Sequence, residues 1–236
     1  IKWSSQGVSF IGAAASRMVL AMVCAVALCK LLKIAVRWSD GYWKSYLAGS
    51  GGVFCGLMIV YWSAQYVPSG LITVIFGLTP LISAVLETLI LKEAMLSRSR
   101  MAAIIVAFSG LLLVFLGELD AVDNALIGLF LLIVAVMFFN FSSIFVKKFD
   151  RDSHPLAQTA GTLIVSSICY SIVWVVFDGH VPQDVPYRAA GSIVYLAIMG
   201  SVVGFFSYYY MLRHLRVSTT NLITVMTPVI ALLLGV

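Results

Sequence analysis

Eight long apolar blocks, separated by short polar segments, restrict what this sequence can fold into. Each block has roughly 16 to 24 residues, about the number that an α-helix needs to cross some 30 Å of hydrocarbon. Hydrophobic residues make up 61% of the chain and charged residues 11%, against about 45–50% and about 25% in globular domains. The sequence therefore predicts an all-α polytopic membrane protein. It excludes an ordinary cytosolic enzyme, a secreted disulfide scaffold and a coiled coil.

The connections between these blocks are too short to form a second, soluble domain. Four prolines lie in or beside connections, where a missing N–H costs little. The predicted spans are 8–29, 46–65, 69–91, 101–116, 125–146, 155–177, 189–212 and 219–236.

Basic residues predict the orientation of these spans. The connections after the first, third, fifth and seventh spans carry 12 of the 15 basic residues. The positive-inside rule places this face in the cytoplasm, and we expect the plasma (inner) membrane of a bacterium. Topology accounts for the net charge of +5, so nucleic acid is not a predicted partner. The 12 residues are Lys30, Lys33, Arg37, Lys44, Lys92, Arg98, Arg100, Lys147, Lys148, Arg151, Arg213 and Arg216.

An internal repeat becomes visible when the chain is shifted by 148 residues. The shift aligns two GxxxG pairs and both mid-span prolines without a gap. The matched pairs include Gly52 with Gly200, Gly56 with Gly204, Tyr61 with Tyr209, Thr79 with Thr227, and Pro80 with Pro228. We expect two repeats, at 1–118 and 119–236.

The same shift maps the sixth, seventh and eighth spans onto the first, second and third. The complete repeat then has five helices, which predicts ten in the intact protein and a chain here that lacks the first and the last. Because five is odd, the two repeats enter the membrane from opposite faces. Such inverted repeats are typical of secondary transporters.

Pro80 and Pro228 each lie near the middle of a span. A proline there leaves the carbonyl of residue i−4, here Phe76 or Thr224, without its helical hydrogen bond and bends the helix. Interrupted helices at matching places in two repeats indicate a central substrate site. The alternative is a packing kink. Thr79 and Thr227, which precede the prolines, are candidates for the same path.

Three further polar side chains are candidates for the substrate path. Thr73 and Asn221 each lie seven residues, or two helical turns, before a proline and share its helix face. Asn140 is the other amide within a span. Polar groups in hydrocarbon face protein or a cavity, although hydrogen bonding between helices would explain them equally well.

Aromatic residues repeat in the same register. Tyr61 and Trp62 match Tyr209 and Tyr210, with Tyr208 beside them. Such rings either wall a pocket for an amphipathic solute or form the aromatic belt at the membrane interface, and their depths favour the belt for most of them.

Two ionisable residues lie within spans. Arg17 is roughly 14 Å from the outer end of its helix at 1.5 Å per residue, and it is the default functional candidate, with a bond to helix-break carbonyls as the alternative. Glu87 is roughly 27 Å from the outer end of its helix. We expect Glu87 to reach cytoplasmic water or Lys92, and therefore little or no proton coupling.

The sequence offers no catalytic or metal-binding motif, so we predict neither an enzyme nor a cofactor. The three histidines stand singly, and the cysteines lie within apolar blocks as small core residues. The two GxxxG pairs are interpreted as packing sites.

These residues together resemble the drug/metabolite transporter superfamily, specifically its EamA-type members. The strongest matches are the segments 64–70 (AQYVPSG), 78–81 (LTPL) and 91–93 (LKE), with 217–219 (VST) and 227–229 (TPV) in the second repeat. Arg17 falls where the second helix of that family often has arginine. The resemblance implies ten helices in two repeats and a carrier that works by alternating access.

The resemblance leaves the substrate open. One deep basic residue suits phosphorylated substrates poorly, so we expect efflux or exchange of amino acids or related amphipathic solutes. The alternatives are a multidrug exporter of hydrophobic cations and a non-transporting membrane scaffold. The expected partners are a small-molecule substrate and the lipid bilayer, with a homodimer as a candidate assembly.

Overall fold

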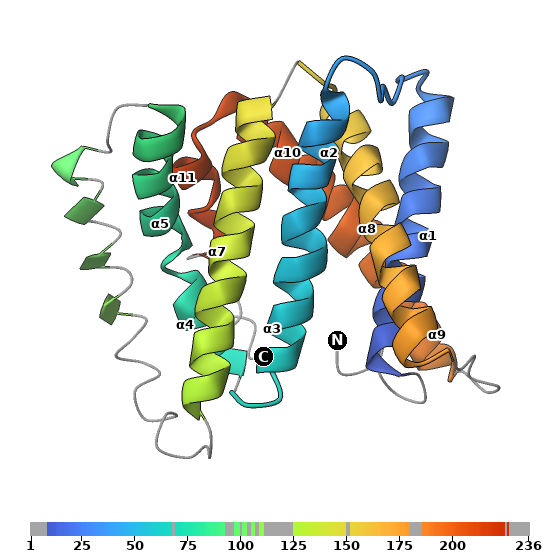
Figure 1. Cartoon of the computed structure of the whole chain (residues 1–236), viewed down its shortest axis with the longest axis horizontal. Coiled ribbons are helices and arrows are strands. Elements are labelled where there is room, and N and C mark those ends of the chain that lie inside the picture. The colour runs from blue at the N-terminus through green and yellow to red at the C-terminus, as the bar shows by residue number, and fades with distance from the viewer. Residues whose placement is uncertain are drawn as a thin grey trace. The chain divides into compact units, whose positions relative to one another are not determined.

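A computed structural model describes residues 9–67, 69–92, 97–99, 101–102, 105–106, 109–110, 125–149, 152–179, 186–224 and 226. The elements within this part of the chain are all helical (Figure 1). The prediction of an all-α polytopic membrane protein is confirmed. The predicted spans 101–116 and 219–236 fall largely outside the described residues.

Six helices in the described part are long and apolar enough to cross a membrane. They match the other six predicted spans to within a few residues at each end. They comprise Phe10–Leu31, Tyr42–Ser63, Leu71–Leu91, Leu126–Phe149, Pro155–Phe177 and Tyr187–His214.

The chain forms two compact units. Unit 1 comprises Ile1–Ser50 and Phe149–Arg213, and unit 2 comprises Gly51–Lys148 and His214–Val236. Each unit therefore combines chain from before and after the predicted boundary at 118/119. That boundary concerns the sequence repeat, and it remains a prediction.

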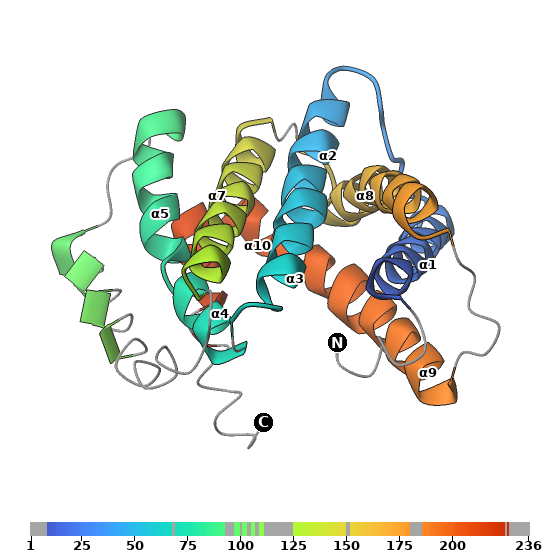
Figure 2. The same cartoon turned by 60° about the horizontal axis from the view of Figure 1, so that its bottom comes forward.

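Unit 1 is built around two long helices, α1 and α8, that run along each other (Figure 2). Small side chains on α1, such as Ala14, Ala21 and Ala25, are fully or almost fully buried and allow this close approach. Helix α2 packs on α8, and α9 and η4 pack on α1. The elements of unit 1 are α1 (Phe10–Leu31), α2 (Tyr42–Ser50), α8 (Pro155–Phe177), α9 (Tyr187–Tyr195), the π-helical segment η4 (Leu196–Val203) and α10 (Gly204–His214).

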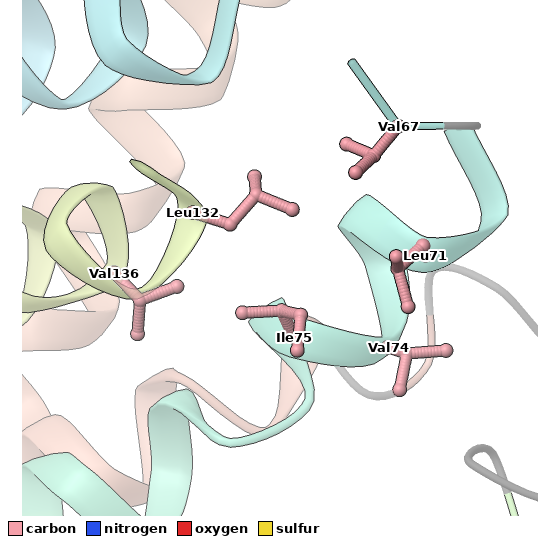
Figure 3. Close-up of a cluster of buried hydrophobic side chains, with 6 residues drawn as sticks. All are labelled: Val67, Leu71, Val74, Ile75, Leu132 and Val136. Atoms are coloured by element: carbon pink, nitrogen blue, oxygen red, sulfur yellow. The ribbon is translucent and has the colours of Figure 1, made fainter. Parts of the chain in front are cut away.

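Unit 2 has an apolar core between α4 and α7. Figure 3 shows Leu132 and Val136 of α7 facing Leu71 and Ile75 of α4, and all four are buried. The elements of unit 2 are η1 (Gly51–Gly56), α3 (Leu57–Ser63), α4 (Ser69–Phe76), α5 (Thr79–Leu86), η2 (Glu87–Leu91), α7 (Ala125–Phe149) and α11 (Val217–Thr220).

The first GxxxG pair lies against α7, which confirms its predicted packing role. A Cβ atom at Gly52 would lie 2.7 Å from the Ser142 hydroxyl, and one at Gly56 would lie 2.8 Å from the Phe139 ring. The second pair differs. A Cβ atom at Gly200 would lie 3.3 Å from the Arg17 guanidinium, and one at Gly204 meets only a carbonyl of its own helix among the described atoms. The packing interpretation of Gly204 therefore stays a prediction.

Three of the described spans contain π-helical segments, which the sequence did not indicate. Under the shift of 148 residues, η1 at 51–56 corresponds to 199–204, which overlaps η4 at 196–203. The two segments therefore lie at corresponding places in the predicted repeats. Such segments are often found at functional sites.

Candidate functional site

The predicted helix break is present in unit 2. Helix α4 ends at Phe76, Gly77 and Leu78 form a turn, and α5 begins at Thr79 with Pro80 in its first turn. The Gly77 and Leu78 N–H groups bond to carbonyls of α4, three or four residues back. Proline fits a first turn because its missing N–H has no partner there in any helix.

A second helical segment supplies the hydrogen bond that Pro80 removes. The Thr224 hydroxyl lies 3.2 Å from the Phe76 carbonyl and 2.7 Å from the Asn221 carbonyl of its own segment. Phe76 and Thr224 are 148 residues apart, so they correspond to each other under the predicted repeat. The contact therefore joins, within unit 2, two residues that the predicted repeat treats as equivalent.

Buried polar side chains of α5 and α7 in this unit retain hydrogen-bonding capacity. The Thr79 hydroxyl and the Asn140 Oδ1 atom have no partner among the described residues. Both side chains are buried, and the Asn140 Nδ2 group donates to the Val136 carbonyl at 2.8 Å. The neighbour of Asn140, Phe139, makes an edge contact with Phe76 at the break, with 5.5 Å between ring centroids. A buried polar group without a partner is costly unless a ligand or water satisfies it.

The other predicted residues of unit 2 lie around this break or on the surface of the unit. Thr73 is half-buried on α4, and Asn221 is buried at the end of α11. Tyr61 and Trp62 lie on α3, where Trp62 is 57% exposed and so fits an interfacial belt better than a pocket. Thr227 and Pro228 lie outside the described residues.

In unit 1, Arg17 is held against the π-helical segment η4. Its Nε atom donates to the Ser201 hydroxyl at 3.1 Å, and its guanidinium lies beside Gly200. The sequence interpretation of Gly200 as a packing site missed this contact and did not name Ser201. Within unit 1, the Arg17 cation thus lies against a segment of irregular helix.

The aromatic candidates of unit 1 lie on α10. Tyr209 is buried, Tyr208 is half-buried, and their rings make an edge contact. The Tyr209 hydroxyl lies 3.3 Å from the Thr162 hydroxyl of α8. Tyr209 is thus engaged inside its own unit.

A buried polar network around Gln158 extends from that contact. Ser45 donates to Gln158 Oε1 at 2.8 Å, and Gln158 Nε2 lies 3.0 Å from the Ser45 carbonyl and 3.3 Å from the Thr162 hydroxyl. Every polar atom of the Gln158 side chain is therefore used. Sequence reasoning did not single out Gln158 or Thr162, although their spacing of four residues puts them on one helix face.

The expectation for Glu87 is wrong. Its side chain is only 3% exposed, and its two oxygens accept hydrogen bonds from the Val217 N–H and, at 2.6 Å, from the Ser218 hydroxyl. The carboxylate therefore caps the first turn of α11, where negative charge is favoured. It does not pair with Lys92.

Comparison with known proteins shows what this arrangement is similar to. A model of the EamA-like transporter family matches residues 1–116 and 126–236. An uncharacterized transporter of Archaeoglobus fulgidus is 23% identical over the whole chain and 82% of its own length. The uncharacterized transporter YyaM of Bacillus subtilis is 25% identical over 68% of this chain, which spans about half, 54%, of that relative.

A third relative carries a substrate in its name. The probable terminal-alkyne amino-acid exporter of Streptantibioticus cattleyicolor is 24% identical over 80% of this chain and 62% of its own length. No solved structure matches the chain.

Proposed function

Because the chain belongs to the EamA-like transporter family, we propose that it exports or exchanges amino acids or related amphipathic solutes by alternating access. The chain is a multi-pass membrane transporter of that family. Family membership leaves its substrate, the direction of transport and the mechanism to be proposed. We place the protein in the plasma (inner) membrane of a bacterium with its Lys- and Arg-rich connections in the cytoplasm.

The observation that carries the mechanism is the helix break at Gly77 and Leu78. The break exposes the Phe76 carbonyl, and its hydrogen bond comes from Thr224 on a different segment. Such a contact can be broken without unwinding a continuous helix. We propose that it opens and closes as the two predicted repeats, 1–118 and 119–236, exchange conformations.

The substrate class is supported by the unused polar atoms of unit 2. Thr79 and Asn140 offer a hydroxyl and an amide oxygen in the buried part of unit 2. An ammonium group is a strong donor to such oxygens, and an apolar side chain suits the surrounding rings. A relative named as an amino-acid exporter adds support at low identity.

A multidrug exporter of hydrophobic cations is the second candidate. It needs a carboxylate within the membrane that a cation can reach. Glu87 is such a carboxylate by position, but both of its oxygens already bond to α11. This engagement favours the amino-acid proposal.

Counterflow tests the proposal. The full chain is reconstituted in proteoliposomes loaded with one amino acid, and uptake of the same labelled amino acid is followed across a panel. We expect saturable exchange within one chemical group of amino acids. No exchange across the panel, with uptake of a labelled hydrophobic cation, would favour the second candidate.

A matched pair of variants tests the break itself. Thr224→Val removes the donor to Phe76, while Thr220→Val removes a hydroxyl that bonds only to its own segment, at the Arg216 carbonyl. Loss of one hydrogen bond, about 1 kcal/mol, should change the exchange rate about fivefold in Thr224→Val alone. Equal rates in the two variants would contradict a role for the break.

A further inference from the structure

A polar cavity of about 240 Å³ lies in unit 1 where α1 ends and where α2 and α8 begin. Its lining includes Arg37, Tyr42, Tyr46, Asp152 and His154. The volume is below the range of about 300–1,000 Å³ typical of sites for drug-sized molecules. It suits one small polar group.

The charged groups in and beside this cavity, Arg37, Asp152 and Arg213, sum to a positive charge. Asp152 forms an ion pair with Arg213 at 3.3 Å, and Arg213 also donates to the Ser153 carbonyl at 3.1 Å. The negative charge of Asp152 is therefore neutralised by Arg213, which does not line the cavity. Arg37 is exposed and forms no ion pair with any residue that the structure describes.

Two long helices also direct their N-termini to this place. One is α2, which begins the span Tyr42–Ser63, and the other is α8 (Pro155–Phe177). The first turn of each helix lines the cavity, through Tyr42 and Ala157. Helix N-termini favour anions through their unpaired N–H groups and their dipole. The His154 Nδ1 atom accepts from the Leu156 N–H at 3.2 Å, which leaves its Nε2 atom as a donor.

A buried hydroxyl gives an independent sign of a ligand. Tyr46 is 1% exposed, and although the Arg37 backbone lies beside its hydroxyl oxygen, the hydroxyl donates to no acceptor within the described chain. Its ring is fixed by an edge contact with Trp38, with 5.1 Å between centroids. A phosphate oxygen in the cavity could accept from this hydroxyl.

The depth of the cavity indicates where such a group comes from. Trp38 and Trp43 are each 44% exposed, and Lys44 lies over the Trp43 ring. Exposed tryptophan and lysine together mark the level of lipid headgroups. Basic pockets between membrane helices at this level bind anionic headgroups.

We propose that this cavity binds the phosphate group of an anionic phospholipid from the membrane leaflet on the basic face. Arg37 supplies the charge, and His154 and Tyr46 supply further donors. This site lies in unit 1, and the proposal does not depend on the transported solute.

Native mass spectrometry of the full chain tests the site. The protein is released from micelles that contain equal amounts of phosphatidylglycerol and phosphatidylcholine, and the retained lipid is counted. We expect preferential retention of phosphatidylglycerol. Arg37→Gln should weaken that retention about fivefold, as expected for one basic residue near an anionic surface, and Arg37→Lys should restore part of it.

Lys30→Gln is the matched control, since Lys30 is exposed on the same face but does not line the cavity. It should retain phosphatidylglycerol as the unaltered chain does. Excess inorganic phosphate separates the two sources of the group. Displacement of the lipid by phosphate, with no remaining preference between lipids, would identify free phosphate as the ligand.

Two results would overturn the proposal. One is an equal loss of phosphatidylglycerol in Arg37→Gln and Lys30→Gln, which would show a general effect of surface charge. The other is the absence of any lipid preference together with no effect of phosphate. Circular dichroism of both variants confirms that each is folded.

Discussion

The Gln158 network of unit 1 and the helix break of unit 2 are both buried and polar, but they use their hydrogen bonds differently. All polar atoms of the Gln158 side chain form hydrogen bonds with Ser45 or Thr162. At the break, Thr79 retains an unpaired hydroxyl among the described residues, and α7 beside it retains the unpaired Asn140 Oδ1.

The difference separates two roles for polar residues in a membrane. A closed network stabilises the packing of continuous helices, because every donor meets an acceptor within the protein. An incomplete hydrogen-bond network leaves donors or acceptors to which a solute can bind. We therefore propose a stabilising role for Gln158 and a substrate-binding role for Thr79 and Asn140, and the variants below test this proposal.

The largest expected effect is that of Pro80→Ala. Alanine restores an N–H that can bond to the Phe76 carbonyl, and it favours a continuous helix by about 3 kcal/mol over proline. If the break must move during transport, the exchange rate should fall about a hundredfold. Counterflow in proteoliposomes measures it.

Pro155→Ala is the control for that variant, since Pro155 lies in the first turn of α8, where proline removes no helical hydrogen bond. Its exchange rate should stay near that of the unaltered chain. Unchanged exchange in Pro80→Ala would show that the break is only a packing kink.

Gln158→Leu should lower stability with little effect on substrate selectivity. It leaves the Ser45 and Thr162 groups without their partner, at a cost of about 2 kcal/mol. Thermal unfolding in detergent measures the loss. Thr159→Val, which removes only a bond to the Pro155 carbonyl of its own helix, should cost less. A change in the preferred amino acid in Gln158→Leu would place the network in the substrate path.

Asn140→Leu should have the smallest effect on stability and a selective effect on transport. The change removes an unpaired buried oxygen, so the unfolding temperature should not fall. The loss of one hydrogen bond to the solute should raise the KM for exchange about fivefold. Ser143→Ala, one turn further along α7, should leave KM unchanged. A lower unfolding temperature for Asn140→Leu, together with an unchanged KM in the protein that remains folded, would show that Asn140 stabilises the fold and does not bind substrate.

The sequence predicted the elements whose signal is local. Apolar length alone located six spans, and Pro80 predicted both the interruption and the carbonyl that lacks a helical partner. The Phe76 carbonyl is the acceptor that Thr224 contacts.

What the sequence missed depends on tertiary contacts. The depth of Glu87 was estimated along a straight helix, whereas its span contains a break and a π-helical segment. Its burial follows from contact with α11, 130 residues away. Likewise Ser201 could not be matched to Arg17 from sequence, because the two lie 184 residues apart.

Substrate protection of a single cysteine tests the central claim that solute binds beside the helix break. Thr79→Cys and Thr162→Cys are each made in a chain whose four native cysteines are replaced, and thiol labelling is followed with and without the amino acid identified by counterflow. The account predicts that this amino acid slows labelling at position 79 and leaves position 162 unaffected. Protection at position 162 alone would contradict it, and so would labelling at position 79 that does not respond to a transported amino acid.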